Sequence, residues 1–372
     1  MSEQITINLT TSVQNSFRVQ QIGGLFDVPI EQKMSKKILI DPPPAQEEDW
    51  KIGLIVGPSG SGKSSTAKML YSAELYQGFS WSSTKAIVDQ FDTPEIKKII
   101  KALNIVGFSS PPSWLKPYSV LSNGEKFRCD LAKALLDSSG DLVVFDEYTS
   151  VVDRTVAKVC SAAVAKGLKE DFIRKKFIAV TCHYDIADWL EPDWILDLAT
   201  GKVARRSLRR PDIKLDIVRV PQSLWTLFAK HHYLSGSLGT NSRCFAAFWE
   251  GTPVAFAALL PLLGFKKRRR ISRIVVLPDY QGAGIGSAFV NTMGDLCREE
   301  GYRLNITTSH PAMIRHCEKS PFWRTISVRK GISSSCQFGK KYVGSAGRAV
   351  VSFEYTADRT GDPCNSGRVS SH

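Results

Sequence analysis

The sequence has no hydrophobic run of 18 residues, so we expect no helix of its own that crosses a membrane. Its first residues, MSEQITINLTTS, lack the charged and apolar regions of a signal peptide, and we therefore expect a cytoplasmic protein. Its eight cysteines stand singly, without a C-x-x-C pair. This spacing disfavours a structural zinc site and favours reduced, mostly buried thiols.

Acidic residues are scarce in the second half of the chain. Residues 1–202 carry 23 Lys and Arg against 25 Asp and Glu, whereas residues 203–372 carry 26 against 11. The net charge of +13 therefore arises entirely in the second half. Such an excess favours an anionic partner, most often nucleic acid; the alternative is general solubility together with a site for an anionic cofactor.

The most informative stretch is KIGLIVGPSGSGKSS, residues 51–65. Its apolar run predicts a buried strand, and the G-x-x-x-x-G-K-S pattern predicts a turn whose backbone N–H groups surround phosphate oxygens. Lys63 would bring a cation to the β- and γ-phosphates, and Ser64 a hydroxyl to Mg²⁺. The residues expected to hold the nucleotide are Gly57, Ser59, Gly60, Ser61, Gly62, Lys63, Ser64 and Ser65.

Two further apolar strands are followed by polar residues that suit nucleotide chemistry. DLVVFDE, residues 141–147, places Asp146 and Glu147 at the C-terminal edge of the predicted sheet, where ligands of open α/β sheets bind. Asp146 suits the water shell of Mg²⁺, and Glu147 suits polarising an attacking water. His183 follows a strand at 177–180 and is placed to reach a γ-phosphate or that water.

The hydrophobic pattern predicts mixed α/β structure in both halves. In the first half we expect further strands at 5–7 and 17–19, and helices at 94–107 and 155–168. After a basic linker at 203–212 we expect, in order, a strand, a helix around 223–234, two strands hinged at 250–253, a strand at 271–277 and a helix at 285–300. The tail at 356–372 has the composition of a disordered segment.

Residues 1–202 resemble the ATP-binding cassette (ABC) ATPases, because their motifs occur in that family's order: the phosphate loop, Gln90 in IVDQF, LSNGEKFR, DLVVFDE, SVVD and the histidine of TCH. The resemblance implies that ATP is hydrolysed, with Glu147 and His183 as catalytic residues. It also implies that Mg²⁺ is held by Ser64, Gln90 and Asp146.

In this family the signature of one protomer closes over the ATP of the other. The resemblance therefore implies a homodimer in which Ser122 and Gly124 act in trans. Asn123 stands where the family usually has glycine, and Glu125 where it usually has glutamine. Because Asn tolerates left-handed backbone, Asn123 is expected to serve in the same turn. The short helical insertion and the lack of a membrane segment favour a mechanical or DNA-repair ATPase over a transporter subunit.

Residues 281–286, QGAGIG, fit the pattern Q-x-x-G-x-G and lie between a predicted strand and helix. This is the coenzyme A pyrophosphate loop of the GNAT-family N-acyltransferases, which residues 213–355 resemble; the alternative is a glycine turn in an unrelated nucleotide fold. The resemblance implies that amides near the end of the strand bind the pantetheine arm and that one of them polarises the thioester carbonyl. The implied cofactor-binding residues are Val276, Leu277, Gln281, Gly282, Ala283, Gly284, Ile285 and Gly286.

Acyl transfer to an amine needs a base for the amine and an acid for the leaving thiolate. Our principal candidates are His232, Tyr233 and Asp279, and the further ones are His231, His310 and Tyr342. Nearby, the cationic run at 266–270 is accompanied by the aromatic residues Trp225, Phe265, Phe322 and Trp323. Such a run is usually a solvated loop, but the combination also suits phosphate tracking with base stacking.

The sequence thus predicts an α/β chain with an N-terminal P-loop ABC ATPase domain, 1–202, and a C-terminal α+β GNAT acyltransferase domain, 213–355. The expected ligands are ATP, Mg²⁺ and acetyl-CoA, and the expected acceptor is an amine on DNA or tRNA. One alternative is a nucleic-acid-binding ATPase whose second domain binds coenzyme A without turnover. Acetylation of a protein or small amine is another alternative, and a transporter subunit is the least favoured.

Overall fold

The computed structural model describes residues 4–12, 14–26, 33–170, 173–205, 211–232, 237–262, 264–330 and 349–356. The chain forms two compact units. The N-terminal unit comprises Met1–Trp81, Phe91–Val106 and Ser122–Pro211, and the C-terminal unit comprises Ser82–Gln90, Gly107–Leu121 and Asp212–His372. The boundaries drawn from the sequence assign 82–90 and 107–121 to the ATPase domain, whereas in the structure both segments pack within the C-terminal unit.

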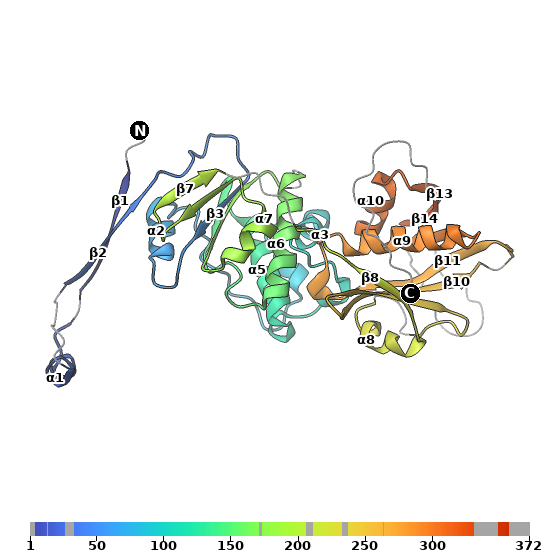
Figure 1. The fold of residues 1–372 in the computed structure, drawn as a ribbon, viewed down its shortest axis with the longest axis horizontal. Helices are drawn as coiled ribbons and strands as arrows, with labels where there is room; N and C mark the ends of the chain where they lie inside the picture. Colours follow the sequence, from blue (N-terminus) through green and yellow to red (C-terminus); the bar gives the residue numbers. More distant parts are fainter. Residues whose placement is uncertain are drawn as a thin grey trace. The chain divides into compact units, whose positions relative to one another are not determined.

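The N-terminal unit is built on a five-stranded sheet (Figure 1). Its strand order is β4 (Leu142–Phe145), β5 (Lys176–Thr181), β3 (Ile52–Val56), β6 (Trp194–Asp197) and β7 (Lys202–Arg205). The first four strands are parallel and β7 is antiparallel to β6. All of β3 is buried, as expected for a strand covered on both faces. The parallel order brings the C-terminal ends of β3, β4 and β5 to one edge of the sheet.

The helices of this unit follow the predicted order. They are α2 (Lys63–Leu70), α3 (Ile96–Ile105), α5 (Asn123–Asp137), α6 (Arg154–Lys169) and α7 (Ala187–Leu190), with a 3₁₀ turn at Tyr184–Ile186. The helices predicted at 94–107 and 155–168 are α3 and α6. Gly167 lets α6 approach α3 closely, because a Cβ at this position would lie 2.5 Å from Cγ2 of Ile105.

A two-stranded antiparallel sheet precedes the central one. It pairs β1 (Ile5–Ser12) with β2 (Lys33–Ile40), and α1 (Phe17–Phe26) lies between them in the chain. The strand predicted at 17–19 is therefore wrong. Phe17, Ile22 and Leu25 follow a helical rather than an alternating period, which three residues were too few to reveal.

The C-terminal unit contains a seven-stranded sheet (Figure 1). Its strand order is β13 (Trp323–Lys330), β14 (Ala349–Tyr355), β12 (Arg303–Thr308), β11 (Arg268–Val276), β10 (Thr252–Pro261), β9 (Arg243–Trp249) and β8 (Asp216–Val220). Neighbouring strands are antiparallel except for β11 and β12, which are parallel. The predicted hinge between β9 and β10 is a two-residue turn in which Glu250 and Gly251 both have positive φ, at 50° and 78°.

Short helices and two longer ones complete this unit. The longer ones are α9 (Ile285–Glu299) and α10 (Pro311–Lys319), and the short ones are α4 (Pro111–Trp114), α8 (Trp225–Ala229) and 3₁₀ turns at Ile87–Gln90, Tyr118–Val120, Gln222–Leu224 and Pro278–Tyr280. Phe289 and Met293 of α9 pack into the main core, whereas Trp225 and Phe228 of α8 form a second cluster with Phe256. Within the described ranges no helix is long and apolar enough to span a bilayer.

Candidate nucleotide and acyl-carrier sites

The phosphate loop joins β3 to α2. Gly60 and Gly62 have φ values of 74° and 100°, which is the left-handed region that a side chain rarely adopts. Gly62 is also packed closely, since a Cβ there would lie 2.7 Å from Cδ1 of Ile38. Lys63 Nζ donates to the Pro58 carbonyl at 2.9 Å, so the lysine folds over its own loop. The glycines and the lysine therefore have the conformation that a phosphate cradle requires.

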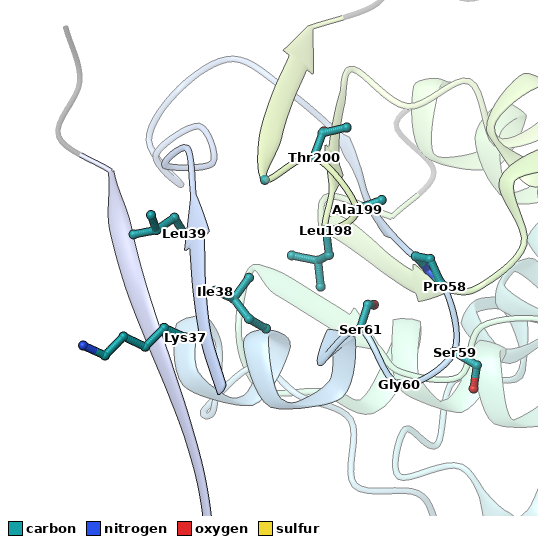
Figure 2. A pocket seen from close by; sticks show the side chains of 11 residues that line it. Lys37, Ile38, Leu39, Pro58, Ser59, Gly60, Ser61, Leu198, Ala199 and Thr200 are labelled. Carbon is teal, nitrogen blue, oxygen red and sulfur yellow. The ribbon is translucent and has the colours of Figure 1, made fainter. Parts of the chain in front are cut away.

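A cavity of about 570 Å³ opens beside this loop (Figure 2). It is lined by residues 58–61 of the loop, 37–39 of β2 and 198–201 of the turn after β6. In Figure 2, Ile38 and Leu198 point toward one another, whereas Lys37 points away. Ser59, Gly60 and Ser61 were all predicted to hold nucleotide, and they line this cavity. Its volume is in the range of small-molecule sites, and Lys63 and Ser64 are not among the residues that line it.

Asp146, Glu147 and His183 follow neighbouring parallel strands. The Glu147 N–H donates to Oδ1 of Asp146 at 2.8 Å, and the Ser150 hydroxyl donates to Oε2 of Glu147 at 2.5 Å. Glu147 has a φ of 52°, a strained value for a residue with a side chain. The carboxylates thus lie at the same edge of the sheet as the Ser64 end of α2. This donor set, a hydroxyl and a carboxylate, suits Mg²⁺.

His183 is oriented by a residue that the sequence analysis missed. Oγ1 of Thr149 lies 3.3 Å from Nδ1 of His183, and it donates its hydrogen to the Tyr148 carbonyl at 2.6 Å. With that hydrogen used, Thr149 accepts from Nδ1–H in one tautomer of His183, whereas the Thr181 hydroxyl, whose Oγ1 lies 3.4 Å from the same nitrogen, donates to it in the other. The only sequence signal was its place two residues after Glu147, since nothing in the pattern shows that its hydroxyl meets a histidine 34 residues away.

Burial lowers the pKa of His183 below its ordinary value, and the Arg154 guanidinium adds to this effect. Asp185 and Glu147 act in the opposite direction. Arg154 also pairs with Asp185 at 2.5 Å, so the cation beside the ring is held in place. The lowered pKa favours the neutral form of the imidazole.

The signature segment differs from its predicted conformation. Asn123 is the first residue of α5 and does not adopt a left-handed turn. Ser122 caps the helix: its oxygen accepts from the Glu125 N–H, while Oε2 of Glu125 accepts from the N–H and hydroxyl of Ser122. This is a capping box, so Glu125 stabilises the helix start where the sequence analysis saw only a departure from the family.

Gln90, the third predicted Mg²⁺ ligand, bonds within its own loop. Its side chain is buried, and its Oε1 accepts from the Ser82 N–H at 2.6 Å. Its Nε2 donates to the carbonyls of Lys85 and Ala86. The amide therefore holds its own loop together, and its role as a Mg²⁺ ligand stays a prediction.

In the C-terminal unit, β11 and β12 separate along their length. They pair from Arg268 and Arg303 as far as Ile271 and Ile306, although β11 continues to Val276. Ser272 is the extra residue of a bulge against β10, between Leu259 paired with Ile271 and Ala258 paired with Arg273. A bulge bends its strand, so it marks the point where the two strands diverge.

At the end of β11, the peptide groups of Val276 and the N–H of Leu277 point in opposite directions. The Leu277 N–H donates to the Val254 carbonyl of β10 at 2.9 Å, so Leu277 does not offer the open amide that the sequence predicted. Because hydrogen-bonding direction alternates along an antiparallel pair, the peptide groups of Val276 face the other side, toward the gap beside β12. Of the two predicted donors, only Val276 is placed to meet an acyl-carrier arm.

The glycine turn follows this gap. Gly282 and Gly284 have φ values of 93° and 94°, and Gly284 begins α9 without a side-chain cap. Gly286 lies close to β11, since a Cβ there would be 3.1 Å from Cγ2 of Val276. Ala283 and Ile285 are buried, and Gly284 has no side chain to cap the first N–H groups of the helix. Strand, turn and helix therefore fit a pyrophosphate next to an extended arm.

The proton-transfer candidates are only partly brought together. His232 packs edge-on against Trp225 with ring centroids 5.8 Å apart, and Trp225 belongs to the cluster that contains Val275 and contacts Leu277. Asp279 lies in the 3₁₀ turn just after β11. Tyr233 and Tyr342 lie outside the described residues. His310 follows β12 and precedes α10.

The cationic surface is smaller than the sequence suggests. Arg269 is largely buried, with its guanidinium 3.8 Å from Glu300 and stacked over Tyr302. Trp225 and Trp323 are each only 6% exposed, so neither forms a base-stacking surface. Phe265, in contrast, is 55% exposed, and the Arg268 guanidinium lies 4.9 Å from its ring centroid.

The fold and the two cradles define a chain that joins a P-loop unit to an acyltransferase-like unit, and the predicted mixed α/β architecture is confirmed. Residues 211–319 match the family model of the acetyltransferase (GNAT) family. A comparison with curated proteins found no match.

Solved structures similar to parts of this chain include N-acetyltransferases and an ATP-binding cassette. The ribosomal-protein-S18-alanine N-acetyltransferase from Escherichia coli is 17% identical over 41% of this chain and 99% of that one, with a TM-score of 0.31. A GNAT family acetyltransferase from Elizabethkingia anophelis with acetyl-CoA bound is 16% identical over 38% and 97%, with a TM-score of 0.30. An ATP-binding cassette in a dimeric post-hydrolysis state, bound to ADP and Pi, is 17% identical over 47% and 93%, with a TM-score of 0.35. Similarity this distant leaves function to be argued from the residues.

Proposed function

We propose that the chain is an ATP-hydrolysing ABC-type ATPase fused to an N-acetyltransferase that transfers an acetyl group from acetyl-CoA to an amine. The observation that carries the transferase part is the gap between β11 and β12 beside Val276, followed by the glycine turn of a GNAT-family domain. In the reaction the acyl C–S bond breaks and a C–N bond forms, and the proton of the amine is passed to the thiolate.

Different residues of the C-terminal unit would bind the coenzyme and transfer the protons in this reaction. The first amides of α9 would hold the pyrophosphate, and the Val276 amide would bind the arm or the developing oxyanion. His232, on the same side of the sheet as Trp225, is our first candidate for removing the proton of the amine. Asp279 and Tyr233 are the alternatives for this step and for protonating the thiolate.

In the N-terminal unit the phosphate loop would bind ATP, with Mg²⁺ held by Ser64 and Asp146. Glu147 would polarise the attacking water, and His183 would bind the γ-phosphate. We propose a homodimer in which Ser122 and Gly124 close over the partner's ATP. Replacing Glu147 by Gln should then leave an ATP-bound dimer that light scattering detects, whereas a variant that stays monomeric at saturating MgATP contradicts the dimer.

We propose nucleic acid, DNA or tRNA, as the carrier of the amine. The support is the charge excess of residues 203–372 and the exposed cations Lys266, Lys267 and Arg270 beside Phe265. A base in a duplex would have to leave the stack to reach the site. Protein lysine and small amines are the competing acceptors.

The test is a mass comparison of DNA and tRNA from cells that express the wild type, Lys63→Ala or His232→Ala. A nucleoside heavier by one acetyl group, present only with an active chain, supports the proposal. An acetylated protein or small amine, found in place of a modified nucleoside, would identify that molecule as the acceptor. Acetyl-CoA binding in calorimetry without any acetylated product would instead favour a domain that senses the coenzyme without turnover.

A further inference from the structure

A segment from the first half of the sequence is built into the acetyltransferase unit. Residues 107–121 belong to the same compact unit as 212–356. Phe108 and Trp114 anchor the segment, since both are buried and Nε1 of Trp114 donates to the Phe108 carbonyl at 2.9 Å. A bridge between Ala86 and Pro117 ties it to the other inserted segment, 82–90. The segment is therefore held in a defined position.

The main chain of Ser109 connects the two diverging strands. Its N–H donates to Oε1 of Gln281 at 2.8 Å, and its carbonyl lies 3.2 Å from Nε2 of His310. Gln281 in turn donates from Nε2 to the Val276 carbonyl at 2.9 Å, which is the end of β11. On the other side, the His310 N–H donates to Oγ1 of Thr308, the last residue of β12. The main chain of this one residue thus bridges the mouth of the gap.

We propose that the Ser109 peptide competes with the arm of acetyl-CoA for this gap, and that the segment 107–121 must release Gln281 and His310 for the coenzyme to bind fully. The inference rests on the proposed acetyltransferase function. A pantetheine arm is a chain of amides, so it presents the same kind of donor and acceptor as a peptide. The peptide groups of Val276 face the gap. The Val276 carbonyl already accepts from Nε2 of Gln281, while Oε1 of the same side chain accepts from the Ser109 N–H.

Only the backbone of Ser109 makes these contacts, which provides a matched pair of variants. Ser109→Pro removes the N–H that Gln281 accepts, whereas Ser109→Ala keeps it and loses only the hydroxyl. We expect Ser109→Pro to bind acetyl-CoA roughly three- to tenfold more tightly in calorimetry than the wild type, as the loss of a competing hydrogen bond implies, and Ser109→Ala to match the wild type. Equal or weaker binding by a folded Ser109→Pro overturns the competition. If no variant and no wild type binds acetyl-CoA, the proposed function itself fails.

Hydrogen exchange tests the same idea on the unchanged chain. The Ser109 amide should be protected in the free protein, because Gln281 accepts from it. Saturating acetyl-CoA should speed its exchange while slowing exchange of the first amides of α9. Exchange at Ser109 that stays constant or slows, with α9 protected, shows that the coenzyme binds without displacing the segment. This readout holds even if Ser109→Pro does not fold.

Discussion

The two cradles use the same local device in different sheets. Each is a strand, a turn with two glycines at positive φ, and a helix that begins at glycine without a side-chain cap: Gly60 and Gly62 before α2, and Gly282 and Gly284 before α9. They differ in the strand. β3 is paired with β5 along its whole length and with β6 from Gly53 to its end, whereas β11 loses β12 after Ile271.

This difference decides which ligand each cradle fits. Above a closed sheet, bound phosphates can meet only the turn, the helix and the ends of neighbouring strands, so the first cradle suits a compact triphosphate. An open sheet also offers unpaired peptide groups along one strand edge, so the second suits a long amide-bearing arm. A lysine completes the first turn, at Lys63, whereas the corresponding part of the second has none.

The largest effect should come from the lysine that distinguishes the first cradle. Replacing Lys63 by Ala removes the cation expected at the β- and γ-phosphates, and we expect MgATP affinity to fall by about 100-fold or more. Acetyl-CoA binding should be unchanged. Lys68→Ala, an exposed position on the same helix, is the control, and titration calorimetry with both ligands is the measurement. A parallel loss of acetyl-CoA binding would mean that the two cradles are not independent.

The second cradle should lose its affinity for acetyl-CoA when one of its glycines is replaced. Gly284→Leu places a side chain at a φ of 94° directly before the first amides of α9, and we expect acetyl-CoA affinity to fall by about 30-fold or more. Gly301→Leu is a matched control, because Gly301 also has positive φ and open space around it, at the other end of α9. Both variants should lose similar thermal stability, but only the first should lose coenzyme binding.

Sequence patterns predicted the parts of both cradles that depend on neighbours in the chain. The glycine turns, the carboxylates after β4 and the order of elements follow from local spacing. The role of Ser109 could not be predicted, because its partners Gln281 and His310 lie 172 and 201 residues away in the sequence. Glu125 is a different case, because its capping-box role follows from the local S-x-x-E pattern of residues 122–125.

We expect a smaller effect when the charge of Glu125 is removed and its helix-capping role is kept. Gln can form the same capping box, so Glu125→Gln should keep α5 intact while removing a carboxylate from beside Ser122. If Ser122 meets the partner's ATP, turnover should rise roughly two- to fivefold, the range that a surface charge worth about 0.5–1 kcal/mol gives. Phosphate release measures it, and Glu125→Ala, which loses the box, is the control. Unchanged turnover would argue against contact between the signature and ATP.

The smallest expected effect concerns pH and the C-terminal cradle. Burial lowers the pKa of His310 below its ordinary value of 6.5, despite the opposing contact with the Ser109 carbonyl. The unfolded chain therefore binds more protons than the folded one between the lowered pKa and 6.5, so stability falls as the pH drops through this window. One such group contributes a slope of at most roughly 1.4 kcal/mol per pH unit.

Replacing His310 by Gln keeps an N–H donor for Ser109 but removes the titration. Denaturation of both proteins between pH 5 and pH 8 should then show a flatter acid limb for the variant, because one source of proton uptake on unfolding is gone. At pH 8 the histidine is neutral in both states, so any remaining difference in unfolding free energy reflects packing and hydrogen bonding alone. If the unfolding free energies of the two proteins ran parallel over the whole pH range, His310 would bind its proton as readily in the folded chain as in the unfolded one. Water would then reach the imidazole even while it contacts the Ser109 carbonyl.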